Sequence, residues 1–220
     1  MRPDAGARHE PRPLRPLSAL ARDIPPCGHV AGQYARGDFE HGVHKAPANA
    51  PLEWVHGVSV ALDDGAHGIL NDAGINVIRP LAGRGTRILG ARMASSDPDW
   101  RYVNVRRLVM MIEKAIDRST QWAAFEPNDA HTRAKIRMSL FGFLAALWQQ
   151  GVLAGASPDA AFFVKCDDAN NPPREREAGK MIADVGVAPS RPWEFIVVRI
   201  GRAGNEFELT EYSFGRGSAR

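Results

Sequence analysis

The sequence predicts an α+β fold in which a mixed β-sheet is flanked by helices, with extended N- and C-terminal arms. Two long amphipathic helices occupy the middle of the chain, and short strand-like runs precede and follow them. Apolar residues make up 44% of the 220 residues and charged residues 24%, which is enough apolar surface for a buried core. We expect a Pro- and Arg-rich tail over residues 1–24, one folded domain over residues 25–200, and a C-terminal arm over residues 201–220.

The N-terminal third predicts a helix, a strand and a second helix. The pair Pro25-Pro26 ends the tail, and residues 29–39 after it favour a short helix. Prominent valines predict a strand over residues 54–62. The turn signal that begins at Asp63 introduces another short helix. We expect this helix to end at Gly74, because glycine readily adopts the left-handed conformation that closes helices.

A glycine-rich stretch, Gly83-Arg84-Gly85, separates two runs that predict strands over residues 75–78 and 86–93. No Gly-Lys-Ser/Thr sequence follows these glycines, and the chain continues into a strand rather than a helix. The stretch is therefore neither a P-loop nor a dinucleotide-binding fingerprint. A turn between the two strands accounts for it better.

Two amphipathic helices give the strongest periodic signal. Their apolar residues recur at a 3.6-residue period over residues 105–116 and again over residues 136–147. Asp129 precedes the second helix as a capping residue, and Gly151 follows it. The apolar stretch at residues 140–148 is too short to span a membrane and predicts a buried helix. We therefore expect no membrane span, and the Arg- and Pro-rich start is no secretory signal.

The last third of the chain turns to strands. Residues 161–166, 181–187 and 195–200 form apolar runs, and residues 206–210 alternate strictly between polar and apolar side chains, as a half-exposed strand would. A strand near a chain end carries unpaired backbone groups that can join the sheet of another subunit. A hairpin within the same chain accounts equally well for the alternation.

The net charge of +3 resides in the N-terminal tail. Residues 1–22 hold five arginines and two acidic residues, and the remaining residues carry basic and acidic groups in equal number. A nucleic-acid-binding domain usually concentrates basic charge on one face of its fold. We therefore expect no nucleic-acid partner, although a module that binds through the basic tail remains an alternative.

The residues that could carry chemistry form no catalytic constellation. His41 and His44 are three apart but lack further ligands at metal-binding spacing. Cys27 and Cys166 form no disulfide framework, suit a reducing cytosol and are expected to be free buried thiols. We therefore select no catalytic, cofactor-binding or metal-ligating residue. Four tryptophans beside periodic elements are expected to anchor the core: Trp100, Trp122, Trp148 and Trp193.

Several segments, taken in order, resemble one family. Residues 25–32 read Pro-Pro-Cys-Gly-His-Val-Ala-Gly, which is similar to a Pro-Pro-Ser-Gly-x-Val-Ala-Gly segment of that family. Further segments agree in order and spacing: residues 70–79, 90–92, 100–107, 125–128, 147–151, 162–167, 186–189 and 192–196. Over about residues 25–200 the chain thus resembles the C-terminal domain of contractile phage tail sheath proteins. Phage tails, R-type pyocins and extracellular contractile injection systems share this family.

The resemblance implies a structural subunit and not an enzyme, with no cofactor. Subunits of this family assemble helically around an inner tube, above a baseplate, and contract to drive the tube through a target envelope. The implied partners are other sheath subunits, the inner tube protein and the baseplate, and a longer sheath paralogue is a further candidate. The implied location is a virion tail or phage-tail-like particle, assembled in the bacterial cytoplasm.

In this family neighbouring subunits are linked by exchanged terminal strands. The resemblance therefore implies strand exchange between subunits through four apolar residues of the C-terminal runs: Phe195, Val197, Phe207 and Leu209. Family members are longer, with an N-terminal arm and usually outer domains before this region. Residues 1–24 are therefore either a short arm or the product of a truncation. Two alternative functions stay open: a small cytosolic enzyme of unknown reaction, and a truncated sheath remnant that does not assemble.

Overall fold

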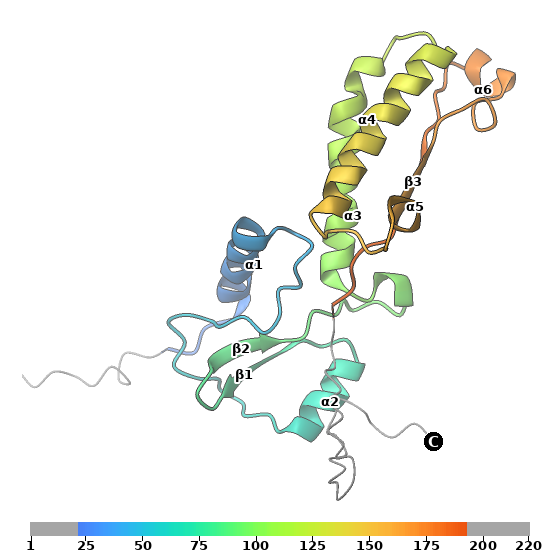
Figure 1. Ribbon diagram of the computed structural model, residues 1–220. Coiled ribbons are helices and arrows are strands. Elements are labelled where there is room, and N and C mark those ends of the chain that lie inside the picture. Colours follow the sequence, from blue (N-terminus) through green and yellow to red (C-terminus); the bar gives the residue numbers. More distant parts are fainter. Residues whose placement is uncertain (1–21, 193–220) are drawn as a thin grey trace, which may run out of the picture.

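Two long helices, α3 (Val103–Thr120) and α4 (Ala130–Gln149), lie side by side in the computed structural model, which describes residues 22–192 (Figure 1). Both confirm the predicted amphipathic helices. Asp129 caps α4 as predicted, since its side chain accepts a hydrogen bond of 2.8 Å from the backbone N–H of Thr132. Gly151 follows α4 in the left-handed conformation, with a φ of 74°.

A two-stranded antiparallel sheet covers this helix pair. Its strands are β3 (Phe162–Lys165) and β4 (Asp184–Val187), and two short helices flank them, α5 (Pro158–Ala161) and α6 (Pro173–Glu177). The strands confirm those predicted at residues 161–166 and 181–187. The main core lies between helices and sheet, and its buried members include Leu108, Ile112, Leu144, Val152, Leu153 and Phe162.

Short elements form the other end of the molecule (Figure 1): α1 (Cys27–His41), α2 (Asp64–Asp72), β1 (Val77–Leu81) and β2 (Gly85–Leu89). The two strands form an antiparallel hairpin, and the predicted glycine turn joins them. Gly83 and Gly85 there have φ values of 70° and 74°. Two single turns of 3₁₀ helix complete the described range, η2 (Pro98–Trp100) and η3 (Gln121–Ala123).

The two ends meet where α1 contacts the start of α3. Arg107 on α3 donates to both carboxylate oxygens of Asp38 on α1. Asn104, one turn earlier, is buried and donates 2.9 Å to the carbonyl of His44. These polar contacts and the apolar contact of Val43 with the main core join the N-terminal part to the helix pair.

Three predictions need correction. Residues 54–62 form no strand: Trp54 has a φ of 61°, which interrupts an extended run, and residues 49–52 lie along β2 instead. The α+β class is confirmed, but the strands between residues 22 and 192 form two separate antiparallel pairs rather than one mixed sheet, because β1 and β2 lie beyond one end of the long helices whereas β3 runs beside them (Figure 1). Cys27 is exposed, since it begins α1 on the surface.

The tryptophans also differ from expectation. Trp122 is exposed, while Trp100 and Trp148 are half-buried, and Trp193 lies outside the described residues. Trp100 stacks beneath the guanidinium of Arg106, 4.8 Å from its ring centroid, and the ring nitrogen of Trp148 donates to the carbonyl of Gly155. The smaller aliphatic side chains that face one another between helices and sheet fill the core in their place.

Candidate functional site

Among residues 22–192, the β3–β4 sheet has two edges that pair with no further strand. Phe162 pairs with Val187 and Val164 with Val185, and these four side chains pack toward the helices. No third strand pairs with either outer edge within residues 22–192. Because the outward backbone groups of a two-stranded sheet are free to accept another strand, both edges are candidate docking sites for an extended segment.

The outward face of the same sheet is shaped by one glycine. Phe163 pairs with Gly186, and its exposed ring lies across the position where a side chain of residue 186 would stand. A Cβ atom built on Gly186 would lie 2.1 Å from the Cε1 atom of the ring. The ring therefore covers the glycine, which gives the face a flat aromatic surface.

A largely apolar groove runs along the β4 side of the sheet. Its volume is about 660 Å³. Val185 of β4 lines it, together with residues of α3, α4 and the segments 123–128 and 176–183, so the groove lies between β4 and the helix pair. Its apolar lining residues include Ile116, Ala123, Phe125, Ile136, Leu140, Met181, Ala183 and Val185, and Glu126, Arg176 and Lys180 add charged groups to the lining.

Phe125 stands at the rim of this groove and is fully exposed. Its backbone has a φ of 70°, a conformation that is costly for a residue with a side chain. An exposed aromatic ring held in a strained conformation beside an apolar groove is typical of a surface that receives a partner. The groove and the adjacent β4 edge together form what we call the strand-docking groove.

A buried polar cluster fixes the segment that carries β4. Asn171 is completely buried, and its amide group donates to the carbonyls of Asp167 and Ile182 at 3.1 and 2.8 Å. Its oxygen accepts from the backbone N–H of Ile182 at 2.8 Å and from the amide of Asn128 at 3.2 Å. Arg133, also buried, donates to Asn128 and to the carboxylate of Asp168. The cluster holds the connection between β3 and β4 against the start of α4.

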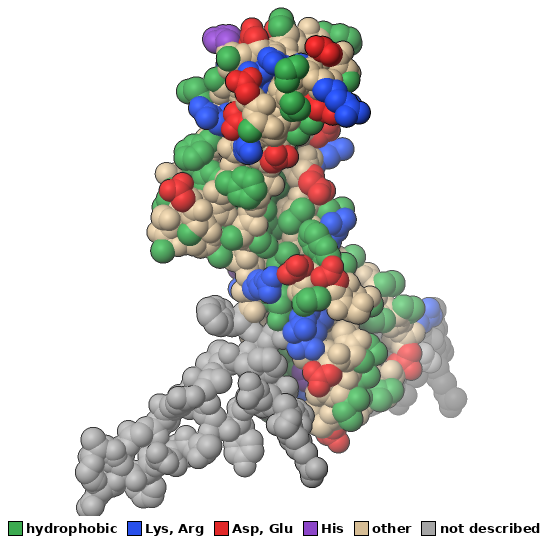
Figure 2. Space-filling model, turned by 90° about the vertical axis from the view of Figure 1, so that its right-hand side faces the viewer, with side chains coloured by type: hydrophobic (Ala, Val, Ile, Leu, Met, Phe, Trp, Pro, Cys, Tyr) green, Lys and Arg blue, Asp and Glu red, His purple; other side chains and the backbone are tan. Residues whose placement is uncertain are grey.

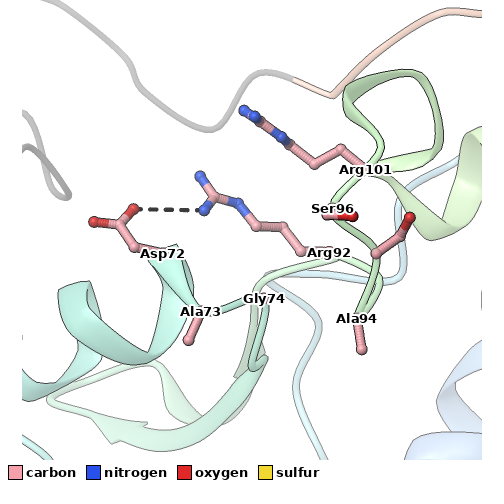
Figure 3. Close-up of a pocket in the computed structure, with 8 residues that line it drawn as sticks. Asp72, Ala73, Gly74, Arg92, Ala94, Ser96 and Arg101 are labelled. Atoms are coloured by element: carbon pink, nitrogen blue, oxygen red, sulfur yellow. Dashed lines mark ion pairs between the residues drawn. The ribbon is translucent and has the colours of Figure 1, made fainter.

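A second pocket, rich in arginine, lies at the other end of the molecule (Figure 3). Its volume is about 670 Å³, and it opens between the end of α2 and residues 92–101. Arg92 and Arg101 extend toward the same opening from neighbouring segments, because the backbone N–H of Met93 bonds to the carbonyl of Arg101 at 2.7 Å. Arg92 pairs with Asp72 at 3.5 Å.

The residues weighed for catalysis do not converge. Cys166 is buried, and this burial raises the pKa of its thiol above the ordinary value, which opposes formation of a nucleophilic thiolate. In the described part of the chain, no three His, Cys, Asp or Glu side chains come together in a way that could hold a metal ion.

None of the helices between residues 22 and 192 is long and apolar enough to cross a bilayer.

The charges of the body are mixed. Lysine and arginine side chains alternate with aspartate and glutamate on the face that Figure 2 presents, and no basic stripe runs along it.

Four residues were predicted for strand exchange, and all of them lie outside the described residues: Phe195, Val197, Phe207 and Leu209.

Comparison with known proteins matches this chain to tail sheath proteins. Residues 95–201 match the family described as the phage tail sheath C-terminal domain. The chain is 26% identical over 194 residues to the tail sheath protein of Vibrio phage KVP40. The aligned region covers 86% of this chain and 28% of the phage protein.

Two solved assemblies contain chains of the same fold. A chain of the anti-feeding prophage baseplate is 41% identical with a TM-score of 0.76, covering 81% of this chain and 50% of that chain. A chain of the contracted PVC sheath complex, from an extracellular contractile injection system, is 39% identical with a TM-score of 0.78, covering 81% of this chain and 51% of that chain. The chain thus spans about half the length of these solved relatives and under a third of the phage protein. The resemblance inferred from the sequence motifs is confirmed.

Proposed function

This chain belongs to the contractile tail sheath family, and from that premise we propose that it is a structural sheath subunit. It assembles helically around an inner tube and contracts to drive the tube through a target envelope. The observation that carries the proposal is the 39% identity and TM-score of 0.78 to a chain of a contracted sheath complex across 81% of this chain. The partners are further sheath subunits, the inner tube protein and the baseplate, with a longer sheath paralogue as a further candidate.

General physics supports a helical assembly. A head-to-tail contact that does not close into a ring generates an open helix. Strand addition supplies directional backbone hydrogen bonds at each joint, so links between subunits can persist while the subunits reorient. Contraction is then a switch between two packed arrangements of near-rigid bodies. The particle is a virion tail or phage-tail-like particle assembled in the bacterial cytoplasm, and the chain itself performs no catalytic step.

We assign residues 25–200 to the sheath domain, residues 1–24 to an N-terminal tail and residues 201–220 to a C-terminal arm. The arm adds as a strand to the β4 edge of a neighbouring subunit, in the strand-docking groove. Phe207 and Leu209 are two residues apart, so in a strand they project from the same face, roughly 7 Å apart. That spacing lets both enter an apolar groove about 660 Å³ in volume. Phe195 and Val197 have the same spacing and form the preceding part of the exchanged segment.

The two faces of the predicted arm strand provide a matched test. We expect the double variant Phe207→Asp/Leu209→Asp to lose assembly, because two charged carboxylates would replace apolar side chains against Ile136, Leu140 and Val185 of the groove. The control Glu206→Gln/Glu208→Gln alters the opposite face of the same strand and is expected to assemble. Sedimentation of purified protein measures both. Equal assembly by the two double variants would contradict strand exchange through this face.

A further inference from the structure

We propose that the pocket between α2 and residues 92–101 is a carboxylate-binding site, and that its occupant is Glu194 of the same chain. The ion pair formed there fixes the direction in which the C-terminal arm leaves the body. The binding itself does not depend on the sheath function, whereas its consequence for the arm rests on that proposed function. Three observations support the assignment: the positive charge of the pocket, the course of the chain beside it at Arg191, and the number of residues between Arg191 and the acidic residues that follow.

The pocket is positively charged and partly buried. Two guanidinium groups and one carboxylate, that of Asp72, line it (Figure 3). The side chain of Arg92 is only 10% exposed, and it donates 2.6 Å to the carbonyl of Asn71. The side chain of Arg101 is exposed and makes no hydrogen bond or ion pair with any other residue between 22 and 192. A second carboxylate would balance the charge and give Arg101 a partner.

The chain leaves the described body beside this pocket. Arg191 pairs with Asp99 at 3.2 Å, and Asp99 is two residues before Arg101. The segment before Arg191 is also held to the body, since Ala154 donates 2.7 Å to the carbonyl of Ala188. The end of the described chain is therefore anchored on the loop that forms one wall of the pocket.

Glu194 is the acidic residue within reach of this anchor. It follows Arg191 by three residues, which span at most about 10 Å of extended chain. The next acidic residue along the sequence is Glu206, twelve residues further. Pro192 between anchor and glutamate restricts the backbone and narrows the directions in which the chain continues. The carboxylate of Glu194 can then accept hydrogen bonds from the guanidinium groups of both Arg92 and Arg101. Hydrogen bonds between guanidinium and carboxylate groups are strong and directional.

Charge exchange tests the pair. We expect Glu194→Arg and Arg101→Glu each to lower the Tm by about 2–4 °C, and the combined variant to recover most of the loss. Glu194→Gln, which keeps the shape of the side chain, should give a smaller decrease. Glu206→Arg is the matched control for an acidic residue of the same segment and is expected to leave the Tm unchanged. Arg101 is chosen over Arg92 because Arg92 also bonds to the backbone of α2.

All variants are measured by circular dichroism on the monomeric fraction, so that loss of assembly cannot imitate loss of the ion pair. Equal effects of Glu194→Arg and Glu206→Arg, or additive effects of the two charge reversals, would overturn the assignment. A Tm shift that grows with protein concentration would also overturn it, because the carboxylate would then come from a second copy. A concentration-independent shift with recovery in the combined variant supports it.

Discussion

A chain that lacks residues 201–220 is expected to fold as a monomer and to form no polymer. The deletion removes Phe207 and Leu209, which we assign to the strand-docking groove of the neighbouring subunit. The buried apolar residues of the part of the chain that the structure describes lie between Leu52 and Cys166, and the deletion leaves all of them in place. Folding and assembly therefore separate in this variant, and the effect on assembly is expected to be all or none.

Circular dichroism measures the fold of this variant, and sedimentation velocity measures its assembly. The matched control removes residues 213–220 only, which leaves the predicted strand at residues 206–210 in place. We expect the control to assemble. Polymers of normal length from the chain without residues 201–220 would contradict strand exchange by the C-terminal arm. Failure of both truncated chains to fold would instead assign the arm to the core.

The substitution Asn171→Ala is expected to destabilise the fold by about 3 kcal/mol. It leaves the backbone N–H and carbonyl of Ile182 and the carbonyl of Asp167 without the amide that now pairs them. It also removes one of the two acceptors of the Asn128 amide, which keeps its bond to the carbonyl of Lys180, and Asn128 is itself bonded to the buried Arg133. Each buried polar group left without a partner costs roughly 1–3 kcal/mol, so losses within this cluster accumulate.

Thermal unfolding checks this expectation, with a decrease in Tm of about 6–12 °C for a chain of this size. Gln149→Ala is the control, because it removes an exposed amide at the end of α4. A decrease no larger than that of the control would mean that the polar cluster does not hold the β3–β4 connection. We also expect weaker assembly from Asn171→Ala, since β4 then loses the support that fixes its edge.

The parts of the fold that follow from local patterns could be predicted from the sequence. The apolar stripes of residues 105–116 and 136–147 are repeated over three turns, and tertiary packing reinforces them in α3 and α4. The capping side chain of Asp129 and the left-handed Gly151 are local signals that act within one turn of the helix. These signals therefore place both helices correctly before any long-range contact is known.

The strand predicted at residues 54–62 was wrong because β-propensity depends on a neighbouring strand. Residues 49–52 bond to β2 instead: the backbone N–H of Leu52 donates 2.8 Å to the carbonyl of Thr86. Trp54 then turns the chain away from the hairpin with its φ of 61°. Valine-rich composition alone could not reveal which segment would take the place beside β2.

The candidate site could be predicted only in outline. The motifs that carry the family resemblance include Arg92 and Asn128, yet their partners come from distant parts of the chain. The strand-docking groove joins Ile116 on α3 with Val185 on β4, and the polar cluster joins Asn128 to Asn171. Such contacts depend on how the elements pack, which a single sequence without an alignment does not reveal. The four predicted exchange residues lie outside the described range and remain a prediction.

Negative-stain electron microscopy of the purified chain, alone and with its matching inner tube protein, tests the sheath function most directly. We predict helical tubes or stacked rings, with the chain forming a layer around the inner tube when both proteins are present. Monomers under every condition would contradict a self-sufficient sheath. That result would favour a remnant that does not assemble, or a subunit that depends on a longer sheath paralogue.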